Sequence, residues 1–282
     1  MKNCKRSAIP LLAMMLGLSS MTCPLAVETD AKQETKTLPT PRQVVASHVQ
    51  ALGGEEALTQ YSSMQLKGKF IMAAQGISAP MKLLSARPNK LLLDVTIPGL
   101  GAILTGYDGE VGWNINPATG PTLMEGILLK QTAEDGNFLR DLYRAEDYLS
   151  METVGISKFN GRPCVQLKMV SKGGLESQVF FDEKTGLVAG TIATQQSMFG
   201  PVKATTEYND FKEFGGVQIP TRVVVRLGGI EQSIAVESIE WDKIEATAFD
   251  LPADIKTLLS ESEKPSAPDQ KKADNSKEKS KD

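Results

Sequence analysis

The sequence is poor in the residues that build metal and redox sites. Its 282 residues include one histidine, His48, and three cysteines, Cys4, Cys23 and Cys164. A structural zinc site needs about four cysteine or histidine ligands at short spacings, and a thiol redox pair needs two neighbouring cysteines. Neither pattern is present in the chain. The sequence therefore predicts no metal site and no bound cofactor.

Recognisable catalytic motifs are lacking as well. The chain contains no Gly-x-Ser-x-Gly, no P-loop and no Gly-x-Gly-x-x-Gly after a strand. A nucleophile-histidine-acid triad would have to use His48, which falls on the apolar stripe of a predicted helix and is expected to be packed there. Carboxylates are plentiful but stand mainly in turns, where they cap backbone groups. An aspartate-only hydrolase stays open as an alternative, and we expect a protein without catalytic residues.

An excess of positive charge is also missing. The net charge is -3, and no basic stripe with interleaved aromatic residues runs along the chain. Proteins that bind nucleic acid neutralise phosphates with such stripes. We therefore expect no nucleic-acid partner.

The longest apolar run near the N-terminus, Ala8 to Leu18, is shorter than the roughly 20 residues of a membrane-spanning helix. It follows Lys2, Lys5 and Arg6, and this order is typical of a secretory signal. We assign residues 1–26 to a signal peptide and expect an exported, periplasmic protein. Cys23 is either a lipid-anchored cysteine or is discarded with the signal.

Composition divides the rest of the chain into three parts. Residues 27–39 are polar and lack periodicity, which predicts a linker. Residues 40–259 hold nearly all the patterned segments and form the predicted domain. Residues 260–282 consist almost entirely of Lys, Glu, Asp, Ser, Pro and other polar residues, and cannot bury enough apolar surface to fold.

Hairpins dominate the predicted domain. Asp108-Gly109 separates two alternating stretches, residues 102–107 and 110–116, and such a pair favours a tight hairpin turn. Apolar and polar residues also alternate from Met64 to Met72 and from Lys90 to Ile97, which predicts two further strands. Further turn pairs recur towards the C-terminus: Asn160-Gly161, Gly173-Gly174, Gly215-Gly216 and Gly228-Gly229. The sequence predicts one large, curved antiparallel sheet of at least ten strands.

Two helical regions accompany the strands. Thr40 and Pro41 can cap and start a helix that Gly53-Gly54 ends. Residues 125–144 show helical spacing, divided at Gly136-Asn137, which predicts two helices packed on the concave face of the sheet. The insert carries Glu134, Asp135, Asp141, Glu146 and Asp147, with Arg140 and Arg144 interleaved. We interpret these charges as a solvated, ion-paired face and not as metal ligands.

The order of these features resembles a known family. A helix ending in Gly-Gly, a meander reaching Tyr107-Asp108-Gly109 with a nearby tryptophan, and a helical insert are followed by FDEKTGLV and YNDFKEFGGVQIPTRV. From Pro41 to Leu251 this order resembles the LolA-like family, especially its outer membrane lipoprotein-sorting proteins. The resemblance implies an α+β, mostly β fold: an open antiparallel half-barrel of about eleven strands, with helices covering the concave face. It also implies an arginine that latches the helical lid, for which Arg87 and Arg140 are the candidates.

The resemblance implies a function too, namely binding of lipid or lipoprotein acyl chains in an apolar cavity. The predicted lining is one apolar face: Phe70, Met72, Leu91, Leu93, Val95 and Trp113. The plainer interpretation of that face is ordinary core. We expect an exported, monomeric, non-catalytic carrier, with a possible envelope protein partner. The alternative is an envelope scaffold of the same fold without a cavity.

Overall fold

The computed structural model describes residues 37–197 and 200–262. The chain divides into two units, Met1–Thr37 and Leu38–Asp282, and all the described helices and strands belong to the second. The predicted signal peptide, Cys23, almost all of the predicted linker and the tail beyond residue 262 lie outside the described residues. Helices α1 (Pro41–Ala51) and α2 (Glu55–Thr59) begin the fold, and α3 (Gly126–Gly136) and α4 (Ala253–Ser262) follow.

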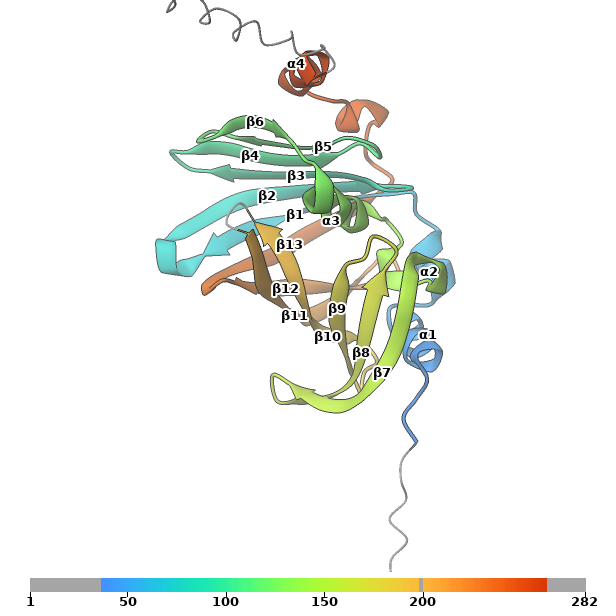
Figure 1. Cartoon of the computed structure of the whole chain (residues 1–282). Coiled ribbons are helices and arrows are strands. Elements are labelled where there is room, and N and C mark those ends of the chain that lie inside the picture. The colour runs from blue at the N-terminus through green and yellow to red at the C-terminus, as the bar shows by residue number, and fades with distance from the viewer. Residues whose placement is uncertain (1–36, 198–199, 263–282) are drawn as a thin grey trace, which may run out of the picture. The chain divides into compact units, whose positions relative to one another are not determined.

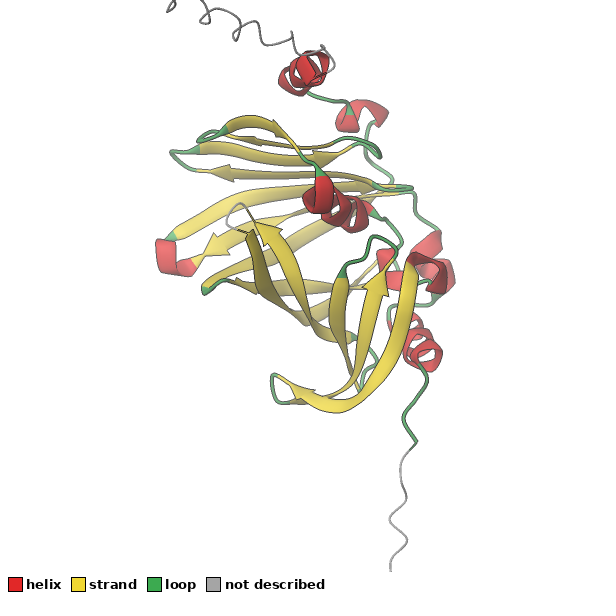
Figure 2. Ribbon diagram, viewed as in Figure 1, coloured by secondary structure: helices red, strands yellow, loops and turns green. Residues whose placement is uncertain are grey.

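Thirteen strands form one antiparallel sheet that does not close, in the order β6-β5-β4-β3-β2-β1-β13-β12-β11-β10-β9-β8-β7 (Figures 1 and 2). The first group is β1 (Ser63–Met72), β2 (Ile77–Ala86), β3 (Lys90–Ile97), β4 (Gly101–Tyr107), β5 (Gly112–Asn116) and β6 (Gly120–Leu123). The second group is β7 (Tyr148–Phe159), β8 (Arg162–Ser171), β9 (Glu176–Asp182), β10 (Val188–Ser197), β11 (Gly200–Phe214), β12 (Val217–Leu227) and β13 (Ile230–Trp241). The mostly β, open sheet is confirmed.

The expected count of about eleven strands is wrong. The sheet has thirteen, and one strand beyond the expected count is β6, which contains Gly120-Pro121. Proline has no N–H to donate, but an edge strand leaves one side of its backbone unpaired. Pro121 lies on such an edge strand, so the sheet tolerates it.

The Asp108-Gly109 hairpin is confirmed, with a longer turn than expected. Tyr107 pairs with Gly112, which leaves residues 108–111 as the connection. The Asp108 carboxylate accepts hydrogen bonds from the backbone N–H groups of Glu110 and Val111, at 2.9 and 2.7 Å. An aspartate that bonds its own following backbone stabilises a turn in this way.

Helix α3 lies on the concave face of the curved sheet (Figure 1). It contacts β3, β4 and β5 on one side and β10 on the other, although these strands are far apart in the sheet order. A Cβ placed on Gly112 would lie 2.8 Å from Leu129 Cδ1, so glycine lets α3 approach β5 closely. The sheet therefore curves around this helix.

The prediction of a second helix in the insert is wrong. After α3 the chain makes only two 3-10 turns, η2 (Arg140–Leu142) and η3 (Ala145–Asp147). Tyr143, between them, has a φ of 45° in the left-handed region. An α-helix cannot continue through that conformation.

The helices do not all cover the concave face. On that face α1 places Val44 in a core cluster with Leu167, Val179 and Phe181. The last 3-10 turn, η4 (Ala246–Phe249), lies against the other face of β3: Lys90 Nζ is 5.9 Å from the Phe249 ring centre, and Lys90 alternates with Leu91. Helix α4 packs against β6 and buries Ile255 completely. Both faces of the sheet therefore carry packed layers.

Candidate ligand-binding site

The concave face holds an open apolar pocket, which we call the apolar compartment. It encloses about 380 Å³ between the sheet and the segment that follows α3. Strands β1, β2, β12 and β13 supply most of its apolar wall: Met64, Leu66, Met81, Leu83, Val223, Ile234 and Val236. The insert closes the opposite side with Phe138, Leu139 and Leu142. Small-molecule pockets in proteins have volumes of roughly 300–1,000 Å³.

The six predicted lining residues do not all meet here. Leu91 lines the apolar compartment. Phe70, Leu93 and Val95 pack beside it, in the core cluster around Leu66 and Met81. Met72 ends β1, on the same face as Phe70 by strand alternation.

Trp113 faces the other way. It pairs across the ladder with Gly106, and Gly106 pairs with Leu92, so all three point to the face opposite Leu91. Its side chain packs over Gly106, where a Cβ would lie 2.2 Å from the indole ring. The prediction that Trp113 shares a face with Leu91 is wrong, because glycine and not tryptophan pairs with Tyr107.

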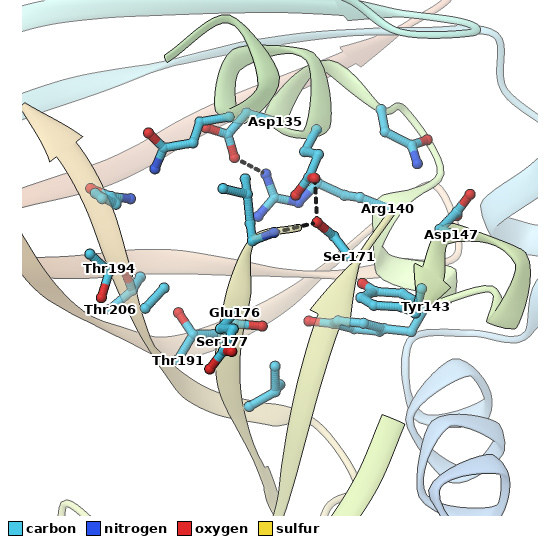
Figure 3. A pocket seen from close by; sticks show the side chains of 18 of the residues that line it. Asp135, Arg140, Tyr143, Asp147, Ser171, Glu176, Ser177, Thr191, Thr194 and Thr206 are labelled. Atoms are coloured by element: carbon cyan, nitrogen blue, oxygen red, sulfur yellow. Dashed lines mark hydrogen bonds and ion pairs between the residues drawn. The ribbon is translucent and has the colours of Figure 1, made fainter. Parts of the chain in front are cut away.

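A second, smaller pocket adjoins the apolar one, and we call it the polar compartment (Figure 3). It encloses about 220 Å³. Short hydroxyl side chains line its floor on β8 to β11: Ser171, Ser177, Thr191, Thr194 and Thr206. Carboxylates approach from α3, η3 and the start of β9: Glu134, Asp135, Asp147 and Glu176. Hydroxyls donate or accept as needed, so this surface suits an oxygen-rich group.

The two compartments meet at η2. Asp135, Asn137, Arg140, Tyr143 and Tyr208 line both of them. Arg140 Nη1 donates to Asp135 Oδ1 at 2.8 Å. The Arg140 side chain keeps 47% of its accessible surface and lines both compartments. The insert therefore places a cation at the junction.

The electrostatics keep this cation charged. Enclosure of the Arg140 guanidinium acts to lower its pKa, but Asp135, Tyr208 and Asp141 outweigh that effect and raise the pKa above its usual value. Burial raises the pKa of Tyr143 and of Tyr208, and brings that of Tyr148 to about 12. At neutral pH the three tyrosines are therefore neutral hydroxyls around a charged arginine.

Glu134 ties the lid helix to the sheet. Ser171 Oγ donates to Glu134 Oε1 at 2.5 Å, which links the C-terminal turn of α3 to the end of β8. Burial raises the pKa of the Glu134 carboxyl, and the hydrogen bond from Ser171 only partly opposes this shift. Enclosure therefore makes ionisation of the Glu134 carboxyl less favourable than it is in water.

His48 is buried, as expected for a packed helix residue, and it also lines the apolar compartment. Its Nδ1 lies 3.2 Å from the Gly186 carbonyl oxygen, and its ring packs edge-on against Tyr143 and Phe181. Burial lowers its pKa. Within the described ranges no serine, threonine or cysteine bonds to His48, and no group of three possible metal ligands lies together.

The two candidate latch arginines lie in different places. Arg87 Nη2 donates to the Thr59 carbonyl oxygen at 2.6 Å, and its guanidinium is 5.8 Å from the Phe138 ring centre. Arg140 lies inside the hollow. The expected solvated, ion-paired acidic face holds for Asp135, which is exposed and pairs with Arg140, although it also lines the polar compartment. It is wrong for Glu134, which is half-buried and bonds to Ser171. The sequence pattern of alternating charge could not separate these two environments.

The fold has known counterparts among solved structures. The chain is similar to a DUF1329 family protein from Desulfovibrio piger, with 13% identity, 74% of this chain and 95% of that chain covered, and a TM-score of 0.51. It is similar to a LolA superfamily protein from Nitrosomonas europaea, with 14% identity, 76% and 98% covered, and a TM-score of 0.49. A domain from Vibrio parahaemolyticus described as an outer membrane lipoprotein-sorting protein has 12% identity, 77% and 95% covered, and a TM-score of 0.47.

At such low identity these similarities concern the fold alone. The DUF1329 protein, with the TM-score above 0.5, carries that comparison. A scan of protein-family models and a search of curated proteins give no match. In the part of the chain that the structure describes, no helix has the length and apolarity to cross a bilayer.

Proposed function

We propose that this protein binds acyl chains of lipids or lipoproteins in the apolar compartment and carries them without covalent chemistry. The observation behind the proposal is the open space of about 380 Å³ against the sheet's own apolar side chains. Each methylene moved from water into such a space gains about 0.8 kcal/mol. Met64 and Met81 belong to the wall, and methionine adapts its shape to flexible ligands.

Two further observations support the proposal, one from the sequence and one from the structure. The leader over residues 1–26 supports export to the cell envelope. The environment of His48 supports a non-catalytic role, because its Nδ1 faces the Gly186 carbonyl and its ring packs against aromatic neighbours. A carrier of this kind needs no general base.

An envelope interaction module is the second candidate, and it draws on edge strand β7. Leu149 and Val154 on this strand keep 68% and 51% of their surface exposed. Large exposed apolar side chains on an edge are typical of contact surfaces. In this alternative the partner would cover β7, and the apolar compartment would have no role.

A pair of matched substitutions separates the two candidates. Val236 lines the apolar compartment, so V236W should fill the hollow and reduce the lipid that co-purifies, measured by native mass spectrometry. V154W places the same side chain on the exposed edge and should leave co-purified lipid unchanged. Wild-type protein isolated repeatedly without lipid, and with no rise in melting temperature on adding acyl chains, would contradict the carrier.

A further inference from the structure

The two compartments share one wall, and this arrangement selects a kind of ligand. The apolar compartment is lined mainly by aliphatic side chains, and the polar compartment by hydroxyls and carboxylates. Arg140 lines both, at the point where a chain lying in one compartment would meet a head group lying in the other. An amphiphile bound in this way would have its chain-to-head linkage beside the guanidinium.

The Arg140 guanidinium has further N–H donors available at that point. A guanidinium carries five N–H groups. Asp135 takes up Nη1, and the hydrogen bonds formed among the described residues leave the other groups without an acceptor. Arg140 lines both compartments and its side chain keeps 47% of its surface accessible, so a ligand atom can reach these donors. An oxygen acceptor on the ligand would complete the guanidinium's hydrogen bonds.

The surrounding charges decide which acceptor fits. Glu134, Asp135 and Asp147 line the polar compartment, whereas Glu176 at its edge pairs with Lys168 at 3.5 Å. Among the described residues that line this compartment, Arg140 is the one basic side chain. A free carboxylate head would add a further negative charge to this acidic surface, whose cation is already paired with Asp135. A neutral carbonyl oxygen accepts from the same N–H groups without that repulsion.

We infer that the ligand is an acyl ester with an uncharged, hydroxyl-bearing head group, such as an acylglycerol, and that Arg140 donates to its acyl carbonyl. The chain then lies in the apolar compartment, and the head group bonds to hydroxyls such as Ser177, Thr191 and Thr206. This inference rests on the proposed function and names the ligand class of the same site. It makes Arg140 a specificity residue and leaves the apolar wall as the source of affinity.

Three ligands with one chain length test the inference by isothermal titration calorimetry at neutral pH. They are monododecanoylglycerol, the dodecyl glyceryl ether that lacks only the carbonyl, and dodecanoate. We expect the ester to bind about tenfold more tightly than the ether, since a hydrogen bond to a charged group is worth about that much. We expect dodecanoate to bind more weakly than the ester.

Two variants show whether Arg140 is responsible. R140Q should bring the ester and ether affinities to within about twofold of each other. R144Q is the control, because Arg144 forms a surface ion pair with Glu55 at 3.6 Å and lines neither compartment. It should keep the wild-type ratio. A melting temperature close to that of the wild type shows that R140Q is folded.

The outcomes separate this inference from the proposed function. An ester-to-ether ratio that R140Q leaves intact, or dodecanoate as the tightest ligand, overturns the inference while the carrier function stands. Equal binding of all three ligands does the same. No binding of any of the three overturns the proposed function, and the inference with it.

Discussion

Among single residues, Glu134 has the environment with the clearest consequence for pH. Burial raises its pKa in the folded protein, so the folded state holds a proton more tightly than the unfolded chain does. Its contribution to stability is full below the unfolded pKa and is lost as the pH rises through the folded pKa. Glutamine at this position stays neutral and keeps an oxygen to accept from Ser171.

We therefore expect E134Q to gain stability relative to the wild type as the pH rises from about 4 to about 7. Urea unfolding of both proteins across this range measures the difference. E56Q, at an exposed position on α2, is the control and should follow the wild type. Parallel curves for E134Q and the wild type would contradict the assigned environment.

The residue pattern correctly predicted which side chains share a face within one strand, but not which face the next strand of a hairpin presents. Leu91, Leu93 and Val95 lie on the same face because alternation within β3 is enough to place them. Trp113 lies on the other face because Tyr107 pairs with Gly112, and a shift of one residue in register reverses every side chain. Sequence alone could not supply the length of the Asp108 turn that sets this register.

At the scale of elements, helix α1 shows how closely local sequence can specify structure. Gln43 N–H donates to Thr40 Oγ1 at 3.3 Å, and Thr40 N–H donates to Gln43 Oε1 at 2.8 Å, which makes a reciprocal cap. Pro41 occupies the first helical position. The predicted start of this helix is confirmed for these reasons.

Removal of the cap should have a measurable cost. T40A leaves the first-turn N–H groups of α1 without a side-chain acceptor, and we expect the free energy of unfolding to fall by about 1 kcal/mol. Chemical denaturation measures this loss. T40S retains the hydroxyl and should lose at most about half as much.

The insert shows where local sequence was not enough. Its apolar spacing is helical over residues 125–144, yet α3 ends at Gly136 and the rest forms 3-10 turns. Arg140 in the first of those turns and Tyr143 between them line the hollow together with Tyr208 from β11. Contacts between residues so far apart in the chain decide the conformation, and no window of sequence contains them.

At the scale of the whole domain, the concave face is packed at one end and open at the other. The cluster on β8 to β10 buries Leu167 completely, whereas Leu83 on β2 is partly exposed to the apolar compartment. We expect L167A to cost about 2–5 kcal/mol of unfolding free energy and L83A less than about 2. Thermal or urea unfolding compares them. Equal costs would indicate that the hollow is filled in solution.

The residue pattern predicted this sheet and its curvature, whereas the hollow was implied only by the family resemblance. A stripe of Met and Leu at strand spacing has the same pattern whether its side chains interdigitate or face empty space. Gly112 admits α3 close to β5, and the apolar compartment lies between the segment that follows α3 and the strands β1 and β2. This packing depends on contacts between elements far apart in the chain, so a local residue pattern does not specify it.

The two tryptophans lie on opposite faces of the sheet. Trp241 lines the apolar compartment and stacks on Tyr61 with ring centres 4.3 Å apart, while Trp113 keeps only 4% of its surface on the other face. Bromine atoms on a lipid tail quench indole emission only at short range. In W113F the remaining Trp241 should lose its fluorescence when brominated chains bind. In W241F the remaining Trp113 should keep its fluorescence. The intrinsic tryptophan emission therefore reports whether the apolar compartment is occupied, without any added label.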